Sequence, residues 1–404
     1  MSALPPVAMD FSAPPVLERV QQRSLILGAA LLLVCAVGWR MDSAQFFRSW
    51  LVGYVLWIGV SLGCMAILML QHLSGGGWGL VIRRVLEAAS STRVLALMAV
   101  LFLPILAGMD RLYLWTDVAR VAGDHVLEHK APYLNSGFFL ARTAFYFLIW
   151  LGLAHLLFRS SAEQDVTGEA RVRARLQFLS APGLLLYGLT VTFASVDWVM
   201  SLDPHWFSTI YGILFMGGQG VSAMCFVIGI SVLLVQHQPM SAVIRPTHIH
   251  DLGKLLLAFV MLWAYFAFSQ FLIIWSGNLP EEIPWYLHRL HGPWQVIALA
   301  LVLFHFALPF LVLLSRDLKR HARKLAVVAV AVLAMRFVDL YWLVMPNFPE
   351  AAHGIRVHWL DLAAPVAIGG IWMAAFAWHL RGRPLVPLFD PRLKQALEQD
   401  DDAH

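Results

Sequence analysis

Charged residues are scarce in this sequence. Aspartate, glutamate, lysine and arginine make up 13% of the 404 residues, whereas a soluble domain carries about 25%. Hydrophobic residues make up 59%. A water-soluble core cannot hide that much apolar surface, so the composition excludes a soluble globular protein and indicates a chain surrounded by lipid.

The motifs that hold common cofactors are also missing. Cys35, Cys64 and Cys225 stand singly inside apolar segments, so there is no C-x-x-C-H sequence for covalent haem and no cysteine cluster. A buried haem needs facing histidines, and only His305 is central to an apolar segment. The run H-I-H-D at 248–251 lacks a third ligand at suitable spacing, which favours a polar helix start over a metal site. No phosphate-binding glycine motif occurs between a strand and a helix, and we expect this chain to bind no haem, metal or nucleotide.

Long apolar segments are abundant instead. Ten approach the length of about 20 residues that a helix needs to cross a hydrocarbon layer roughly 30 Å thick. They lie near residues 24–39, 49–72, 94–109, 137–158, 178–197, 206–235, 252–275, 294–315, 324–345 and 358–380. Because open strands cannot span lipid with unpaired backbone groups, each segment is expected to be a helix. This predicts an all-α domain over 24–380, with an N-terminal segment 1–23 and a C-terminal tail 381–404.

Lysine and arginine are distributed unevenly among the connecting segments. Under the ten-helix map, 19 of the 29 lie in the two termini, in the loops after the even-numbered helices or at Lys324, where the ninth helix begins, and 7 lie in the other loops. Positive charge accumulates on the cytoplasmic side, so both termini are expected in the cytoplasm. The net charge of +4 therefore reflects topology, and we expect no nucleic-acid partner.

Two connecting segments have a distinct character. Residues 78–88 are short and amphipathic, which predicts a helix lying on the cytoplasmic membrane surface. Residues 110–136 form the longest loop between helices and carry many charges. We expect this loop to be an external surface that faces solvent or a partner.

The sequence contains a sign of internal duplication. S-V-D-W-V-M at 195–200 ends the fifth predicted helix, and F-V-D-L-Y-W-L-V-M at 337–345 lies in the ninth. Both helices run outward, which predicts two parallel four-helix units, helices two to five and six to nine, with flanking helices. Chance similarity between apolar helices is the alternative.

Polar and ionisable side chains in or beside the apolar segments are costly in lipid unless they are paired or functional. The strongest set gathers toward the external face: Arg142, Asp197, Asp203, His205, Gln270, Arg336, Asp339 and Asp361. Asp197 and His205 are candidates for taking protons from a reduced carrier, and the others for binding it or passing protons on. The structural alternatives are an ion pair between Arg336 and Asp339, turn chemistry at Asp203, and a helix-end role for Asp197.

One stretch carries a family resemblance. S-V-D-W-V-M-S-L-D-P-H-W-F-S-T-I-Y-G at 195–212 resembles the signature of one membrane subunit of alternative complex III, the bacterial quinol:cytochrome c (or direct oxidase) oxidoreductase. Residues 250–259, 263–282 and 339–346 support it. The resemblance extends from the fifth predicted helix onward, and the first four helices match mainly in layout.

The resemblance implies a fold and a set of partners. It places the chain in the superfamily of polysulfide-reductase membrane anchors, in the bacterial inner membrane, with two four-helix bundles. It implies an iron–sulfur subunit, multihaem cytochrome c subunits, a paralogous membrane subunit and a terminal oxidase as partners, and menaquinol or ubiquinol as substrate. Within the family the quinol site is better assigned to the sister subunit, so Asp197, Asp203 and His205 either touch quinone or only move protons.

Two other function classes stay open at this point. A secondary transporter predicts helices interrupted at mid-membrane in matching repeats, and the glycine-rich run 217–220 offers one such interruption. A structural scaffold would only hold peripheral redox subunits together. Substituting the polar set separates these classes, because a scaffold loses assembly whereas a redox subunit loses turnover.

Overall fold

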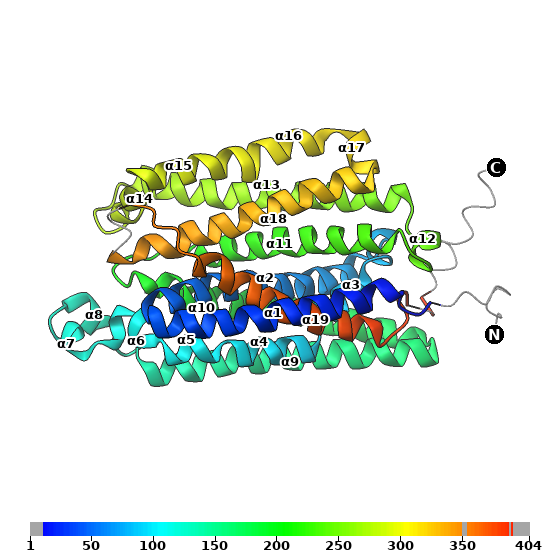
Figure 1. Ribbon diagram of the computed structural model, residues 1–404, viewed down its shortest axis with the longest axis horizontal. Helices are drawn as coiled ribbons and strands as arrows, with labels where there is room; N and C mark the ends of the chain where they lie inside the picture. The colour runs from blue at the N-terminus through cyan, green and yellow to red at the C-terminus, as the bar shows by residue number, and fades with distance from the viewer. Residues whose placement is uncertain (1–10, 350–353, 388, 391–404) are drawn as a thin grey trace.

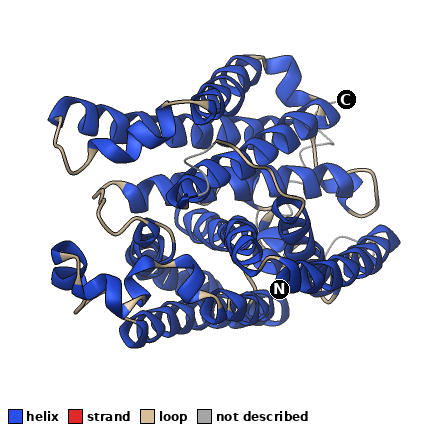
Figure 2. Cartoon of the chain, turned by 60° about the vertical axis from the view of Figure 1, so that its left-hand side comes forward, coloured by secondary structure: helices blue, strands red, loops and turns tan. Residues whose placement is uncertain are grey.

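The computed structural model describes residues 11–349, 354–387 and 389–390, and within these ranges it contains helices and loops but no strand (Figure 2). Ten helical segments of the described residues are long and apolar enough to cross a membrane, and each overlaps one of the ten predicted spans, although the third begins at Arg83 instead of residue 94. The predicted all-α, multi-pass fold class is confirmed.

Most spans are single helices. These are α1 (Pro15–Met41), α2 (Ser43–Ser74), α9 (Ser136–Thr167), α10 (Ala170–Trp198), α11 (Tyr211–Leu234), α13 (Pro246–Gly277), α18 (Ala322–Val344) and α19 (Leu360–Arg381). The third span joins α3 (Arg83–Ala89), α4 (Thr92–Leu101) and α5 (Leu103–Ala107). The eighth joins α15 (Pro293–Ala300), the π-helical segment η4 (Leu301–Ala307) and α16 (Leu308–Leu314). Short helices outside the spans include α6 (Met109–Leu112), α7 (Val118–Ala122), α8 (His125–Lys130), α12 (Met240–Val243), α14 (Ile283–Leu290) and α17 (Arg316–Arg320).

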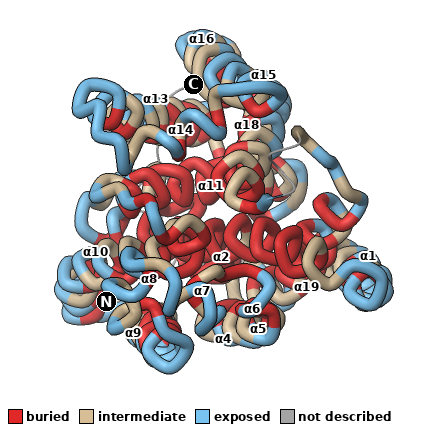
Figure 3. The backbone as a smooth tube through the Cα atoms, turned by 90° about the vertical axis from the view of Figure 1, so that its left-hand side faces the viewer, coloured by how far each residue is buried: buried red, intermediate tan, exposed pale blue. Residues whose placement is uncertain are grey.

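The spans form two four-helix bundles, seen end-on in Figure 3. The first bundle contains α2, α4, α9 and α10, and the second contains α11, α13, α15 with α16, and α18. α2 and α11 pack against each other where the bundles meet, α19 packs on α2, and α1 packs along α19. This arrangement agrees with the predicted four-helix units and flanking helices.

The two central helices, α2 and α11, are buried along most of their length. Their sequences are apolar on all sides, as expected for helices without a lipid-facing or water-facing side. Close contact between them depends on Gly63, because a Cβ at that position would lie 2.3 Å from the Gln219 carbonyl oxygen.

The glycine-rich run 217–220 lies inside α11 and does not interrupt it. Gly218 makes room for a charged side chain, since a Cβ there would lie 2.2 Å from Cζ of Arg336. Gly220 is similarly close to the ring of Phe259. The run therefore supplies close packing, and α11 is not the broken helix that a transporter would need.

The two ends of the bundle differ. α1 begins and α19 ends at one end, together with α12 and α17, and we call this the terminal end (Figure 1). The opposite end carries α6, α7, α8 and α14, and we call it the loop end. An even number of spans returns the chain to the side where it began.

Several helices begin at residues that differ from the predicted spans. α1 begins at Pro15, nine residues before the apolar segment, with a proline at its start and Glu18 in its first turn, both favourable for a helix N-terminus. The sixth span begins at Tyr211 instead of residue 206, because residues 203–210 form a loop.

The prediction that residues 78–88 lie on the membrane surface is wrong. Arg83, Arg84 and Glu87 are 2%, 3% and 6% exposed, because they pair with each other and with residues far away in sequence.

A topology prediction follows from the charge asymmetry. A reporter inserted at Gly123, an exposed residue between α7 and α8, is expected to report the external side. A reporter fused after His404, which lies outside the described residues, is expected to report the cytoplasm. Paired alkaline phosphatase and fluorescent-protein fusions measure this, and the same side for both positions would contradict the ten-span map.

Candidate functional site

A cavity of about 760 Å³ lies inside the second bundle, between α13, α14, η4 and α18. Aromatic and aliphatic side chains make up most of its walls, and polar groups of Gln270, Tyr286 and Asp339 stand among them. Gln270 and Asp339 belong to the predicted set, so the fold brings two of those residues to one cavity.

The cavity opens on the flank of the molecule. Tyr265, Phe268 and Val302 line it and are also 64%, 60% and 57% exposed. Because α13 and the η4 segment belong to spans, this opening faces the hydrocarbon layer. An apolar molecule can therefore enter from lipid without passing through water.

The π-helical segment η4 shapes one wall of the cavity. Pro309 lies in the first turn of α16, where it cannot donate a backbone hydrogen bond and where its ring crowds the carbonyl of His305. The wider turn of η4 accommodates this break in the helical ladder. It also buries His305 completely, with its ring edge-on to Trp263 at a centroid distance of 4.2 Å.

Asp339 lies in an ion pair at the cavity wall. Arg336 Nη1 pairs with Asp339 Oδ2, and Trp263 Nε1 donates to the same oxygen at 3.1 Å. Both charged residues are buried. The pairing expected for residues three apart on one helix is present, and an ionised carboxylate has further acceptor positions for a ligand.

Gln270 and Tyr286 form the polar part of the cavity toward α14. Gln270 Oε1 accepts a hydrogen bond from Ser208 Oγ at 3.1 Å, and Gln270 Nε2 lies 3.4 Å from the Tyr286 hydroxyl. Burial raises the pKa of Tyr286 to about 12. The hydroxyl therefore stays protonated at neutral pH and can donate to a ligand oxygen.

Asp197 occupies a different environment. It is fully buried, and Arg142 binds both carboxylate oxygens at 2.9 Å. The Tyr146 hydroxyl donates to Asp197 Oδ2 at 2.6 Å, and Arg142 Nη1 donates to the Tyr133 carbonyl at 2.9 Å. A bidentate arginine and a tyrosine fill most of the carboxylate's hydrogen-bonding capacity.

Next to this ion pair the first bundle is filled with rings. Trp198 packs against Phe102 and Phe147 at centroid distances of 4.8 and 6.2 Å, and Trp150 lies at 5.8 Å. The space left beside Trp150 and Trp198 is about 20 Å³, enough for a water molecule and too small for an organic carrier. The two bundles therefore differ in their capacity to bind a ligand.

His205 and Asp203 lie outside both interiors, in the loop after α10. His205 Nε2 donates to Asp124 Oδ2 at 2.6 Å, and the His205 side chain is 49% exposed. This hydrogen bond lowers the pKa of Asp124. The structure thus separates the two predicted proton acceptors, Asp197 in a buried ion pair and His205 at the surface.

Asp361 acts at a helix junction. It accepts hydrogen bonds from Ser49 Oγ at 2.6 Å, Gln45 Nε2 at 2.7 Å and the His358 backbone N–H at 2.9 Å. These contacts join the first turn of α19 to α2, and Asp361 does not line the large cavity.

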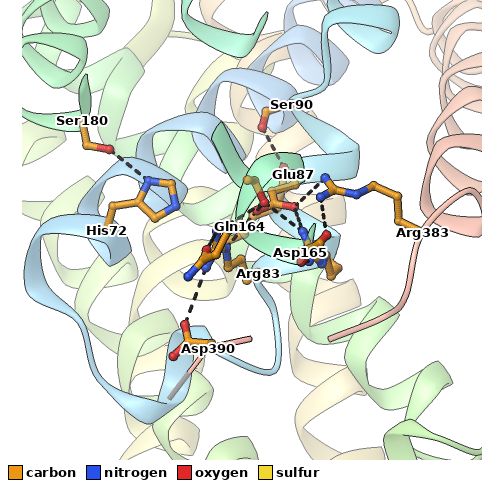
Figure 4. Close-up of polar contacts among 12 residues, drawn as sticks. His72, Arg83, Glu87, Ser90, Gln164, Asp165, Ser180, Arg383 and Asp390 are labelled. Carbon is orange, nitrogen blue, oxygen red and sulfur yellow. Dashed lines mark hydrogen bonds and ion pairs between the residues drawn. The ribbon is translucent and has the colours of Figure 1, made fainter. Parts of the chain in front are cut away.

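A charged network at the terminal end was missed at the sequence level (Figure 4). Glu87 on α3 pairs with Arg83 at 2.9 Å and with Arg84 at 2.5 Å. Asp165 on α9 pairs with Arg84 and, at 2.5 Å, with Arg383 beyond α19. The R-R-x-x-E spacing was a usable signal for the local pairs, but nothing near it in sequence indicated the partners on α9 and after α19.

Other contributors to the cavity were also missed. Tyr286 and Trp263 line it, while Trp206 and Ser208 contact residues at its edge. Trp206, Ser208 and Trp263 lie within the stretches that carry the family resemblance, and Tyr286 lies four residues after one of them, but their types alone are ordinary for membrane interfaces.

Among the described residues, no group of three or more His, Cys, Asp or Glu side chains is placed to hold a metal ion. No protein-family model matches the chain, and no curated protein is significantly similar to it.

Proposed function

We propose that this chain is a membrane subunit of a quinol-oxidising respiratory complex of the alternative complex III type, and that the second-bundle cavity binds the quinol headgroup. The observation that supports this most directly is the cavity itself, which is apolar, opens toward lipid and presents Asp339, Gln270 and Tyr286. The resemblance at residues 195–212 supplies the class of complex.

The cavity suits a flat, hydrophobic ring that carries oxygens. Its volume is within the range of about 300–1,000 Å³ that small-molecule sites occupy. Aromatic walls offer stacking faces, the Tyr286 hydroxyl and the Gln270 amide can hydrogen-bond ring oxygens, and the lateral opening leaves space for an isoprenoid tail in lipid.

Oxidation of a quinol releases two electrons and two protons. In our proposal Asp339 accepts the two hydroxyl protons in turn and releases the first to solvent before it takes the second, because its carboxylate lines the cavity and accepts hydrogen bonds. The electrons pass to the iron–sulfur and haem groups of partner subunits. The prediction that Asp197 and His205 receive protons stays a prediction, and neither residue lines the cavity, which favours Asp339 for the first transfer.

Blocking the cavity tests this function. Ala298 lines the cavity, and Ala298→Trp is expected to reduce labelling of the full chain by a photoreactive azido-quinone at least tenfold. The matched control is Ala334→Trp on the exposed side of α18, which should label like the wild type. Mass spectrometry of the labelled peptides locates the site, and equal labelling of the two variants would refute a quinol site here.

A further inference from the structure

The loop between α10 and α11 crosses from the first bundle to the second. Residues 203–208 of this loop, which we call the positioning loop, carry the D-P-H-W-F-S part of the motif. Two of its residues contact the α8 region: His205 binds Asp124, and the Pro204 carbonyl accepts a hydrogen bond from Lys130 Nζ at 2.6 Å. Trp206 and Ser208 reach the second bundle.

Trp206 contacts α14 directly. Its ring is stacked on that of Trp285, with a centroid distance of 4.5 Å and an angle of 13° between the planes, and both residues are buried. Tyr286, the next residue of α14, lines the cavity. The stack therefore fixes the helix that presents the Tyr286 hydroxyl.

Arg289 holds the other side of α14. It donates to the carbonyls of Trp285 and Leu343 at 3.0 and 3.1 Å and to Asn347 Oδ1 at 2.7 Å, and its guanidinium lies 3.7 Å from the Trp285 ring centroid. Burial lowers the pKa of Arg289 to about 9, which still leaves it charged at neutral pH. The stack with Trp206 adds a contact from the opposite bundle to these bonds.

Ser208 acts on the second polar group of the cavity. Its hydroxyl donates to Gln270 Oε1, which leaves Gln270 Nε2 turned toward Tyr286 and available as a donor. Without this hydrogen bond the buried amide could rotate and present its oxygen instead. Ser208 thus determines which end of the amide a ligand meets.

From these contacts we infer that the positioning loop sets the geometry of the cavity's polar edge, with Trp206 and Ser208 as positioning residues for headgroup binding. This inference rests on the proposed quinol site. It gives residues 203–208, part of the motif that carries the family resemblance, a role in the second bundle. Trp206 and Ser208 carry out that role, and Asp203 and His205 do not.

The test is a mutant cycle on the full chain in nanodiscs, with decylubiquinone as the probe and its Kd measured by calorimetry. Ser208→Ala and Gln270→Ala are each expected to weaken binding about five- to tenfold, the effect of one buried hydrogen bond. The double variant should be no weaker than Gln270→Ala alone, because Ser208 acts through Gln270. Ser208→Thr keeps the hydroxyl and should restore binding.

The control is Ser276→Ala, since the Ser276 hydroxyl donates only to the Ile273 carbonyl on an exposed part of α13. Trp206→Leu should weaken binding and speed hydrogen exchange in α14, whereas Trp206→Phe should retain wild-type binding and exchange.

Two results would overturn the inference. In one, the increases in Kd caused by Ser208→Ala and Gln270→Ala multiply in the double variant. In the other, Ser208→Ala leaves the Kd unchanged, like Ser276→Ala. If Ala298→Trp blocks binding while Ser208→Ala does not, the inference fails and the quinol site stands. If Ala298→Trp has no effect, both fail.

Discussion

Asp339→Asn is expected to lower quinol turnover of the assembled complex by about 100-fold or more. The change removes the carboxylate that we propose as the proton acceptor, and general-base catalysis contributes about 10²–10⁴ in rate. Asparagine has nearly the same shape and its oxygen can still accept from Trp263, so binding should fall far less than turnover. The buried Arg336 loses its counter-ion, so both quantities are measured on preparations that have kept their assembly. Steady-state quinol oxidation and decylubiquinone Kd, measured on the same preparation, separate the two effects.

Asp197→Asn is the matched comparison. Asp197 matches Asp339 in the short similarity between residues 195–200 and 337–345, and like Asp339 it pairs with a buried arginine, but it does not line the cavity. Turnover close to the wild-type value is expected if Asp339 is the acceptor. If instead only Asp197→Asn loses turnover, Asp197 is the proton acceptor, as the sequence predicted. That result would exclude the second-bundle cavity as the reaction site.

Glu87→Gln is expected to destabilise the folded chain by about 3–5 kcal/mol, the usual effect of removing one partner from a buried ion pair. Glu87 lies among Arg83, Arg84 and Arg383 and is buried. Its loss leaves an excess of positive charge in the protein interior. Thermal unfolding in detergent, followed by the yield of monodisperse protein on a size-exclusion column, measures the change.

The control for this prediction is Glu163→Gln on α9. Glu163 pairs with Arg175, but both side chains are well exposed, at 35% and 49%, and exposed pairs contribute about 0–1 kcal/mol. If the two variants unfold at the same temperature, the terminal-end network contributes no more than a surface pair.

Sequence reasoning predicted the spans because lipid imposes a length and a composition on each helix separately. It failed at residues 78–88 because the same charges are compatible with a wet surface or with buried partners. The partners in question, Asp165 and Arg383, are distant in sequence, and an amphipathic pattern does not report on them.

The candidate site was predictable only in part, for a related reason. The Arg336–Asp339 pair follows from local helix geometry, and Gln270 was conspicuous as a polar residue in an apolar helix. The cavity depends on the packing of α13, α14, η4 and α18, which no local pattern encodes. Asp197 and His205 are near neighbours in sequence, yet α10 ends at Trp198 and the chain then turns outward, which separates them in space.

The placement of the two buried arginine–aspartate pairs has a consequence for membrane insertion. Arg336 and Asp339 share α18, so this helix carries its own counter-ion as it leaves the translocon. Arg142 and Asp197 belong to α9 and α10, and each helix alone would bring an unpaired charge into lipid. Insertion of α9 and α10 together as a helical hairpin neutralises both charges, so biogenesis of the first bundle depends on pairing between consecutive spans, whereas α18 can enter the bilayer alone.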